Sequence, residues 1–293
     1  MSPAAVLRRR GGFATRAQLL DVCERRDVDA ALASGTIVWL SRGRYGLPEL
    51  DVAIATAHGL NAVLSHTSAA LWHGWEVKAT PSRTDVTVPR RRRISAGPLV
   101  RAHKCDLPAR DVVEGIATSV ERTLGDCLRS LPFDEALSIA DSALRHGVDR
   151  SVLVEVAHAV RGRGHSNALR VAGKADGEAA NPFESCLRSV AVRVPGLEVR
   201  PQRLVVGTRQ TVRPDLVDER MRIVLEADSF EWHGDRAALR RDARRYNFLV
   251  VDDWLVLRFA FEDVMFDQGY VFDVLHSLVD TRSQVRRCPH CAA

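Results

Sequence analysis

The chain has 293 residues, of which 46% are hydrophobic, and its 42 Lys and Arg exceed its 37 Asp and Glu to give a net charge of +5. This length predicts two or three domains with real hydrophobic cores, and the absence of a long apolar run argues against a membrane-spanning helix. The mildly basic balance is compatible with a nucleic-acid partner and is weak evidence by itself.

The cysteines and the N-terminus bear on the cellular compartment. Six cysteines are scattered through the chain, which fits reduced thiols better than a disulfide framework. The first ten residues place apolar side chains before charged ones, the opposite of a signal peptide, so we expect a cytoplasmic protein. Near the C-terminus, Cys288 and Cys291 would make half a zinc knuckle; we favour a flexible tail, since no second pair lies nearby.

Residues 11–48 have the pattern of two short helices followed by a β-hairpin. Thr15 and Gln18 have capping-box spacing, and Asp27 would cap a second helix over 28–33. The order helix, helix, hairpin is that of a winged helix-turn-helix, which lays one helix in the major groove of DNA. The arginines placed to contact phosphates are Arg25, Arg26, Arg42 and Arg44.

Segments 11–20 and 42–47 resemble the N-terminal domain of AbiEi-type antitoxins of type IV toxin–antitoxin systems. In that family the domain binds promoter DNA, so the resemblance implies DNA binding here without implying that the chain is an antitoxin. A winged helix that binds a protein is the alternative. The resemblance continues more loosely over the following residues, so we expect a winged helix over 1–50 and an α/β extension over 51–165.

The extension contains two candidate sites. His66 and His73 lie two helical turns apart, and hydrogen-bonded packing is the commoner role for such a pair than metal binding. A strand over 85–89 runs into the densest charge cluster, which is either a solvated loop or a phosphate-contacting loop. This cluster is Arg90, Arg91, Arg92 and Arg93. Helices over 118–131, 133–144 and 151–160 are expected to support the first domain, with a boundary near 165–180.

A second domain is expected over residues 178–282. It opens with Asn181 as N-cap, Pro182 at the first helical position and Glu184 at the third. A hairpin follows, with strands over 211–217 and 221–228. With a turn centred on residues 219–220, Val217 would pair with Arg222 and Asp215 with Val224. Side chains alternate along strands, which places Asp215, Glu226 and Asp228 on one face and Leu216, Ile223 and Leu225 on the other.

Three carboxylates at one sheet edge repel each other and need a cation. Oxygen ligands suit Mg²⁺ or Mn²⁺, which would activate water and stabilise charge on a phosphate. His233 follows the acids and would assist proton transfer. The alternative is that the acids are solvated on an open hairpin face. A helix over 236–246 would offer a track for the phosphodiester backbone, or a solvated face, through Arg236, Arg240, Arg241 and Arg244.

An ordered set of residues then resembles a known family, the endonuclease-like proteins related to very-short-patch repair endonucleases. The set is Asp215, Glu226-x-Asp228, Trp232-His233-Gly234, Asp242, Arg245, Leu249, Trp254 and Arg258. These proteins belong to the PD-(D/E)xK superfamily and have a restriction-endonuclease-like fold; the resemblance covers about residues 181–280. It implies that Glu184 reaches the active site, although a simple capping role is the alternative. The sequence departs from the superfamily at Asp228, where Lys is usual.

The sequence therefore predicts an α+β (α/β) chain with a winged helix, an α/β extension, a restriction-endonuclease-like domain and a tail over 283–293. We expect a DNA-binding, Mg²⁺- or Mn²⁺-dependent endonuclease in a toxin–antitoxin, defence or repair setting. Its metal ligands would be Asp215, Glu226 and Asp228, assisted by Glu184 and His233. Two alternatives stay open: a catalytically inactive DNA-binding regulator, and a ribonuclease. A cognate toxin or antitoxin would be a partner, and cutting both strands would favour a dimer.

Overall fold

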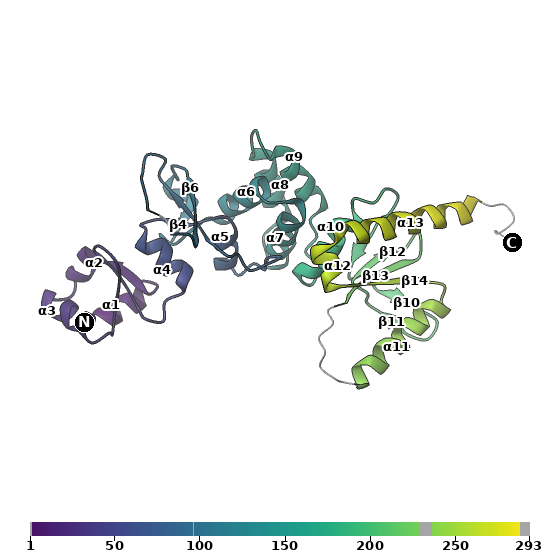
Figure 1. The fold of residues 1–293 in the computed structure, drawn as a ribbon, viewed down its shortest axis with the longest axis horizontal. Coiled ribbons are helices and arrows are strands. Elements are labelled where there is room, and N and C mark those ends of the chain that lie inside the picture. Colours follow the sequence, from purple (N-terminus) through teal and green to yellow (C-terminus); the bar gives the residue numbers. More distant parts are fainter. Residues whose placement is uncertain (1, 96, 229–235, 288–293) are drawn as a thin grey trace. The chain divides into compact units, whose positions relative to one another are not determined.

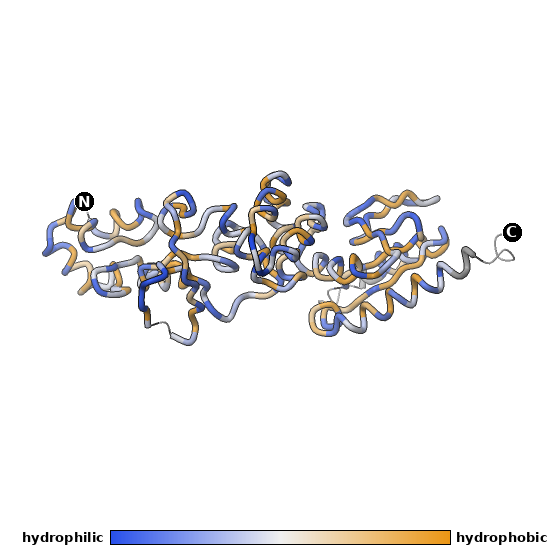
Figure 2. The backbone as a smooth tube through the Cα atoms, turned by 90° about the horizontal axis from the view of Figure 1, so that it is seen from above, coloured by the Kyte–Doolittle hydropathy of each residue, from blue (hydrophilic) through white to orange (hydrophobic). Residues whose placement is uncertain are grey.

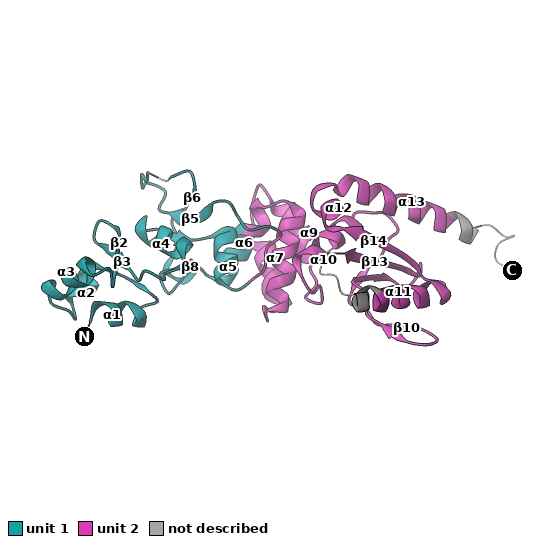
Figure 3. Cartoon of the chain, turned by 60° about the horizontal axis from the view of Figure 1, so that its bottom comes forward, with its two compact units in different colours: residues 1–74, 79–126 teal, residues 75–78, 127–293 magenta. Residues whose placement is uncertain are grey.

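The structure, a computed structural model, describes residues 2–95, 97–228 and 236–287, with the side chains in these ranges except at 236–239 and 284–287. Helices and mixed sheets alternate along the chain, as expected for an α+β fold. The chain divides into two compact units, residues 1–74 with 79–126 and residues 75–78 with 127–293 (Figure 3). No helix in the described ranges combines the length and apolar character needed to cross a membrane.

The first part of unit 1 has the predicted order of two helices and a hairpin. Its elements are α1 (Pro3–Arg9), β1 (Phe13–Thr15), α2 (Arg16–Leu20), α3 (Arg25–Ala33), β2 (Val38–Ser41) and β3 (Arg44–Gly46). Thr15 Oγ1 accepts the Gln18 amide at 3.3 Å and Gln18 Oε1 accepts the Thr15 amide at 2.9 Å, which confirms the capping box. The second predicted helix, expected over 28–33 with Asp27 as its cap, is α3, which begins earlier, at Arg25. Glu24 is its N-cap, and Asp27 lies in its first turn, where an acid interacts favourably with the helix dipole.

The rest of unit 1 is built on a five-stranded sheet in the order β6-β5-β4-β8-β7. Its elements are α4 (Val52–Gly59), β4 (Val63–Leu64), α5 (His66–Trp72), β5 (Thr84–Val88), β6 (Val100–Lys104), β7 (Val112–Val113) and β8 (Ala117–Thr118). The two longer strands, β5 and β6, pair in parallel. The helix α5 fits the packing interpretation: the His66 ring stacks on His103 at 3.6 Å, and His73 Nε2 is hydrogen-bonded to the Thr118 carbonyl at 2.9 Å.

Four helices follow, the first three near the positions expected from the sequence. They are α6 (Val120–Ser130), α7 (Phe133–Arg145), α8 (Arg150–Ala159) and α9 (His165–Lys174). The helices α7, α8 and α9 belong to the second unit, whereas we expected α7 and α8 to support the first domain. A buried ion pair between Asp141 of α7 and Arg188, in the helix that opens the next segment, explains this grouping. The two units divide between Asp126 and Cys127, upstream of the boundary expected near 165–180.

The C-terminal part contains a four-stranded sheet in the order β14-β13-β12-β9 (Figure 1). Its elements are α10 (Pro182–Ala191), β9 (Arg200–Pro201), β10 (Val205–Val206), β11 (Thr211–Val212), β12 (Leu216–Asp218), β13 (Ile223–Asp228), α11 (Arg236–Val251), β14 (Leu255–Ala260), α12 (Phe261–Phe266) and α13 (Gln268–Arg287). β12 is antiparallel to β9 and β13, and β13 is parallel to β14. The last two helices, α12 and α13, are separated at Asp267.

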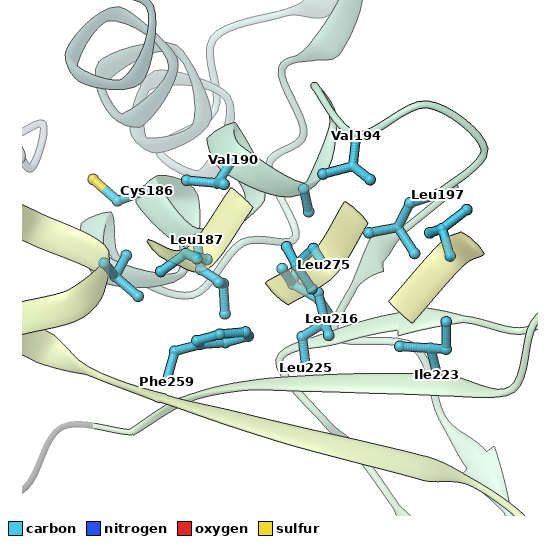
Figure 4. Close-up of a cluster of buried hydrophobic side chains, with 14 of the residues drawn as sticks. Cys186, Leu187, Val190, Val194, Leu197, Leu216, Ile223, Leu225, Phe259 and Leu275 are labelled. Atoms are coloured by element: carbon cyan, nitrogen blue, oxygen red, sulfur yellow. The ribbon is translucent and has the colours of Figure 1, made fainter. Parts of the chain in front are cut away.

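Helices cover both faces of this sheet. Figure 4 shows Leu187 and Val190 of α10 and Leu275 of α13 packed over Leu216 and Leu225 on one face. Hydrophilic and hydrophobic residues alternate along α13, as expected for a helix with one buried side (Figure 2). On the other face, Val217 and Val224 pack with Leu249 of α11. Strand alternation places the candidate acids on this second face, on the side of α11.

Candidate active site

Two of the expected metal ligands lie next to each other at one end of the sheet. β12 pairs with β13 up to Leu216 and Leu225, so the next residues in this register, Asp215 and Glu226, are opposite each other. Asp215 Oδ2 accepts the amide of Ala227 at 2.8 Å, which holds this carboxylate against β13 beside Glu226. The structure therefore brings together the acid pair predicted from the hairpin.

The hairpin register differs from the expected one by two residues. Val217 pairs with Val224, whereas the expected turn would have paired it with Arg222. The buried carboxylate of Asp218 accepts the amide of Met221 at 2.8 Å and holds a longer turn, which Arg222 completes with a φ of 56°. Because the shift is an even number of residues, the acids keep the shared face that was expected, and they become direct rather than diagonal neighbours.

Burial makes both carboxyl groups weak acids, and the charge of Asp215 adds to the effect at Glu226. Burial, followed by the charge of Asp215, raises the pKa of Glu226 to about 8. Burial also raises the pKa of Asp215. Glu226 is only 4% exposed, and its Oε1 has no hydrogen-bond partner among the described residues. Two ionised carboxylates in such a place need a counter-charge, which a divalent cation would supply.

Glu184 hydrogen-bonds to the start of its own helix and to Gln202, which lies beside Asp215. Its amide donates to Asn181 Oδ1 at 3.0 Å, and its Oε2 accepts the amide of Ala180, also at 3.0 Å. The same Oε2 accepts Gln202 Nε2 at 3.0 Å, and the backbone amide of Gln202 donates to the Asp215 carbonyl at 2.9 Å. Burial, then the charge of Asp215, raises the pKa of Glu184. Gln202 thus links the capping glutamate to the acid pair.

On the other side of the acid pair, two arginines flank one tyrosine. Arg245 Nη2 lies 3.4 Å from Glu226 Oε1 and donates to Tyr246 Oη at 2.8 Å. Arg258 lies beside Glu226 in the parallel register and forms an ion pair with Asp228. Asp228 therefore shares the predicted face but is neutralised by an arginine rather than gathered with the other acids. In the described part of the chain, no three His, Cys, Asp or Glu side chains are grouped to hold a metal.

Some of the expected site residues lie outside the described part. Trp232, His233 and Gly234 fall in the gap between residues 228 and 236, the side chain of Arg236 is not described, and the Cys288–Cys291 motif lies beyond residue 287. The remaining arginines expected along α11 are exposed on its surface. They are Arg240, Arg241 and Arg244.

The arginines expected to bind DNA in unit 1 separate into two groups. Arg44 donates to His58 Nδ1 at 3.2 Å and to Asn61, and Arg92 donates to the carbonyls of Leu60 and Asn61. These two guanidinium groups hold β3 and the loop after β5 against the end of α4. The others are exposed: Arg25, Arg26, Arg42, Arg90, Arg91 and Arg93.

Sequence reasoning missed four residues of this site: Gln202, Arg245, Tyr246 and Arg258. Arg245 and Arg258 belong to the ordered set that carries the family resemblance, but their spacing did not show that they meet at one ring. Gln202 gave no local signal, because its two partners are brought to it by α10 and by the start of β12.

Comparisons with known proteins define no family for this chain. No family model matches it. It is 27% identical over 256 residues to the uncharacterized proteins Rv2248 and MT2308 of two Mycobacterium tuberculosis strains, covering 84% of this chain and 93% of each relative. The crystal structure of the RV2827C protein of Mycobacterium tuberculosis is similar at a TM-score of 0.34 and 15% identity, over 68% of this chain and 82% of that one.

Proposed function

We propose that this chain is a DNA-binding, metal-dependent endonuclease that hydrolyses phosphodiester bonds. The observation that carries the proposal is the adjacent, buried pair of Asp215 and Glu226; burial raises the pKa of both groups, and the charge of Asp215 raises that of Glu226 further. A purely structural pair would leave unexplained why two acids lie side by side at a buried edge where Glu226 Oε1 has one ion-pair contact, with Arg245 at 3.4 Å, and no hydrogen bond among the described residues. Perturbed acids of this kind cluster at functional sites.

The donor set fits Mg²⁺ or Mn²⁺. Both groups offer oxygen ligands, and Mg²⁺ is commonly held by one or two carboxylates together with waters and substrate phosphates. Asp215 and Glu226 would hold the ion, which when bound supplies an activated water and neutralises charge on the phosphate. Asp228, with its ion pair to Arg258, would act through that arginine rather than as a third ligand.

The surrounding residues support an ordered site. Gln202 joins Glu184 to Asp215, since its side chain donates to the Glu184 carboxylate and its backbone amide donates to the Asp215 carbonyl. Arg245 fixes the Glu226 carboxylate from the opposite side. Positioned groups of this kind lower the cost of reaching the reactive geometry. His233 stays the proposed proton-transfer residue on the basis of the sequence alone.

DNA binding is proposed for the winged helix, with the exposed Arg25, Arg26 and Arg42 as its phosphate contacts. The resemblance to AbiEi-type domains supports this assignment and suggests a cytoplasmic protein of a toxin–antitoxin, defence or repair system. A cognate toxin or antitoxin partner, and a dimer that cuts both strands, belong to the same proposal.

One observation favours a second candidate, a DNA-binding regulator with an inactive nuclease-like domain. The position where the superfamily usually has Lys is Asp228, and Arg258 neutralises it. The two candidates are separated by incubating the purified chain with single-stranded, duplex and mismatched DNA and with RNA, in Mg²⁺, Mn²⁺ or EDTA. Metal-dependent cleavage of DNA supports the nuclease, cleavage of RNA alone supports a ribonuclease, and DNA binding without cleavage in any metal supports the regulator.

A further inference from the structure

Two guanidinium groups meet on one aromatic ring beside the acid pair. Arg258 Cζ lies 4.6 Å and Arg245 Cζ 4.8 Å from the centroid of the Tyr246 ring. The arginines come from different elements, β14 and α11, so the fold rather than local sequence brings them together. Their side chains are 40% and 31% exposed, which leaves part of each group open to solvent.

Each arginine is held in place by an acid on one side. Asp228 holds Arg258, while Glu226 at 3.4 Å and Asp242 at 3.9 Å hold Arg245. A guanidinium has five N–H donors in a fixed fork, so one carboxylate contact does not use them all. The Nε of Arg245 is buried and has no hydrogen-bond partner among the described residues. Both guanidinium groups are therefore held in place and keep N–H donors that no acid uses.

We propose that Arg245 and Arg258, held against Tyr246, form a binding site for a backbone phosphate of nucleic acid next to the Asp215–Glu226 pair. This site rests on the proposed function, because a phosphodiester is the anion that a nuclease brings to its acids. Arginine forks match phosphate oxygens in a bidentate manner. A pre-positioned pair loses less conformational freedom on binding than the exposed arginines along α11.

The local charge explains when the site binds. Four carboxyl groups, those of Asp215, Glu226, Asp228 and Asp242, surround two guanidinium groups, so the bare site is not strongly positive. A divalent cation bound to the acid pair would make the net charge of the site more positive and so favour the binding of an anion. We therefore expect this phosphate contact to strengthen in Ca²⁺, which resembles Mg²⁺ in preferring oxygen ligands.

The test measures DNA affinity of the full chain by fluorescence anisotropy on a short labelled duplex, in EDTA and in Ca²⁺, over a range of salt. The variants are Arg245→Gln, Arg258→Gln and Tyr246→Leu, with Arg245→Lys and Arg258→Lys as conservative partners. Arg222→Gln is the matched control, because the Arg222 guanidinium also lies over an aromatic ring, that of Trp254 at 5.1 Å, at the opposite end of β13.

In Ca²⁺, each Gln variant and Tyr246→Leu should bind DNA roughly 5- to 20-fold more weakly, and each Gln variant should reduce the salt slope by about 1, as loss of a phosphate contact does. The Lys variants should recover part of the affinity, and Arg222→Gln should match the wild type. Affinities and slopes of the Arg245 and Arg258 variants equal to that of Arg222→Gln would overturn the proposal. If a Gln variant does not fold, as judged by the absence of a thermal melting transition, the corresponding Lys variant is used in its place. Lysine keeps the positive charge but cannot bind phosphate in a bidentate manner, so the Lys variant should still bind DNA more weakly than the wild type.

This outcome is independent of cleavage. Loss of affinity in the arginine variants, with no cutting in any metal, keeps the phosphate site and removes the nuclease. Metal-dependent cutting with unchanged affinity in those variants keeps the nuclease and removes the phosphate site.

Discussion

Asp141 of α7 and Arg188 of α10 form a buried ion pair in which the Arg188 guanidinium donates to both carboxylate oxygens. The Asp141 side chain is 0% and the Arg188 side chain 4% exposed. Ser185 Oγ and the Asp176 amide also donate to Asp141, each at 2.8 Å. The pair joins the helical layer of unit 2 to the helix that carries Glu184.

Removing one partner of this pair should be strongly destabilising. Arg188→Met leaves a buried carboxylate without its counter-charge, and we expect a loss of about 3–5 kcal/mol in the free energy of unfolding. The double variant Asp141→Leu/Arg188→Met removes both charges and should recover much of that loss. Urea denaturation of the three proteins measures this. A loss below about 1 kcal/mol for Arg188→Met would contradict the structural role assigned to the pair.

The acid pair should make stability depend on pH in the absence of metal. The pKa of Glu226 is about 8 in the folded chain and 4.5 in an ordinary setting, so the folded state binds the proton more tightly. Stability should therefore fall as pH rises from about 4.5 to about 8. Glu226→Gln keeps the shape without the titration, so its stability in EDTA should fall less over this range. Parallel curves for the two proteins would show that Glu226 does not titrate as the structure requires.

His58 should give unit 1 a dependence of the opposite sign. The pKa of His58 is lowered to about 4. Burial is the largest cause and the charge of Arg44 adds to it, while the hydrogen bond to the Ala14 carbonyl acts in the opposite direction. The folded state holds the neutral imidazole, so stability is present above pH 6.5 and is lost as the pH falls toward 4. His58→Gln should remove this acid sensitivity. Histidine NMR titration gives the direct check, and a His58 midpoint near 6.5 would contradict the buried environment.

Arg42 and Arg44 should separate DNA contact from internal structure. Arg42 is exposed at the tip of the hairpin, so Arg42→Ala should weaken DNA binding and lower the salt slope by about 1. Arg44 is bound to His58 and Asn61, so Arg44→Ala should lower the melting temperature of unit 1 and leave the slope nearly unchanged. Equal changes of slope in the two variants would show that Arg44 also reaches phosphate.

Features that depend on neighbouring residues were predictable from the sequence. The capping box at Thr15 and the N-cap at Asn181 each need a partner only three positions away, and both are present. The shared face of Asp215 and Glu226 was also predictable, because a change of register by two residues leaves each side chain on the same face of the sheet.

Features that depend on distant partners were not predictable. The turn between β12 and β13 is held by the Asp218 carboxylate, which also accepts the amide of Glu198 at 2.8 Å from another part of the chain. The inward turn of Arg44 depends on Asn61, and the membership of α7 in unit 2 depends on Arg188. The meeting of Arg245 and Arg258 at Tyr246 depends on how α11 packs over β14.

The most direct test of the account is cleavage of the preferred DNA substrate in Mn²⁺ by the wild type, Asp215→Asn, Glu226→Gln and Asp228→Asn. Because a bound metal contributes several kcal/mol to such chemistry, the Asp215 and Glu226 variants should each lose at least about 100-fold in rate. Asp228→Asn, which removes only the partner of Arg258, should lose less. Cleavage by Asp215→Asn and Glu226→Gln at the wild-type rate, or no metal-dependent cleavage by the wild type, would contradict the assignment of this pair as the metal-binding centre of a nuclease.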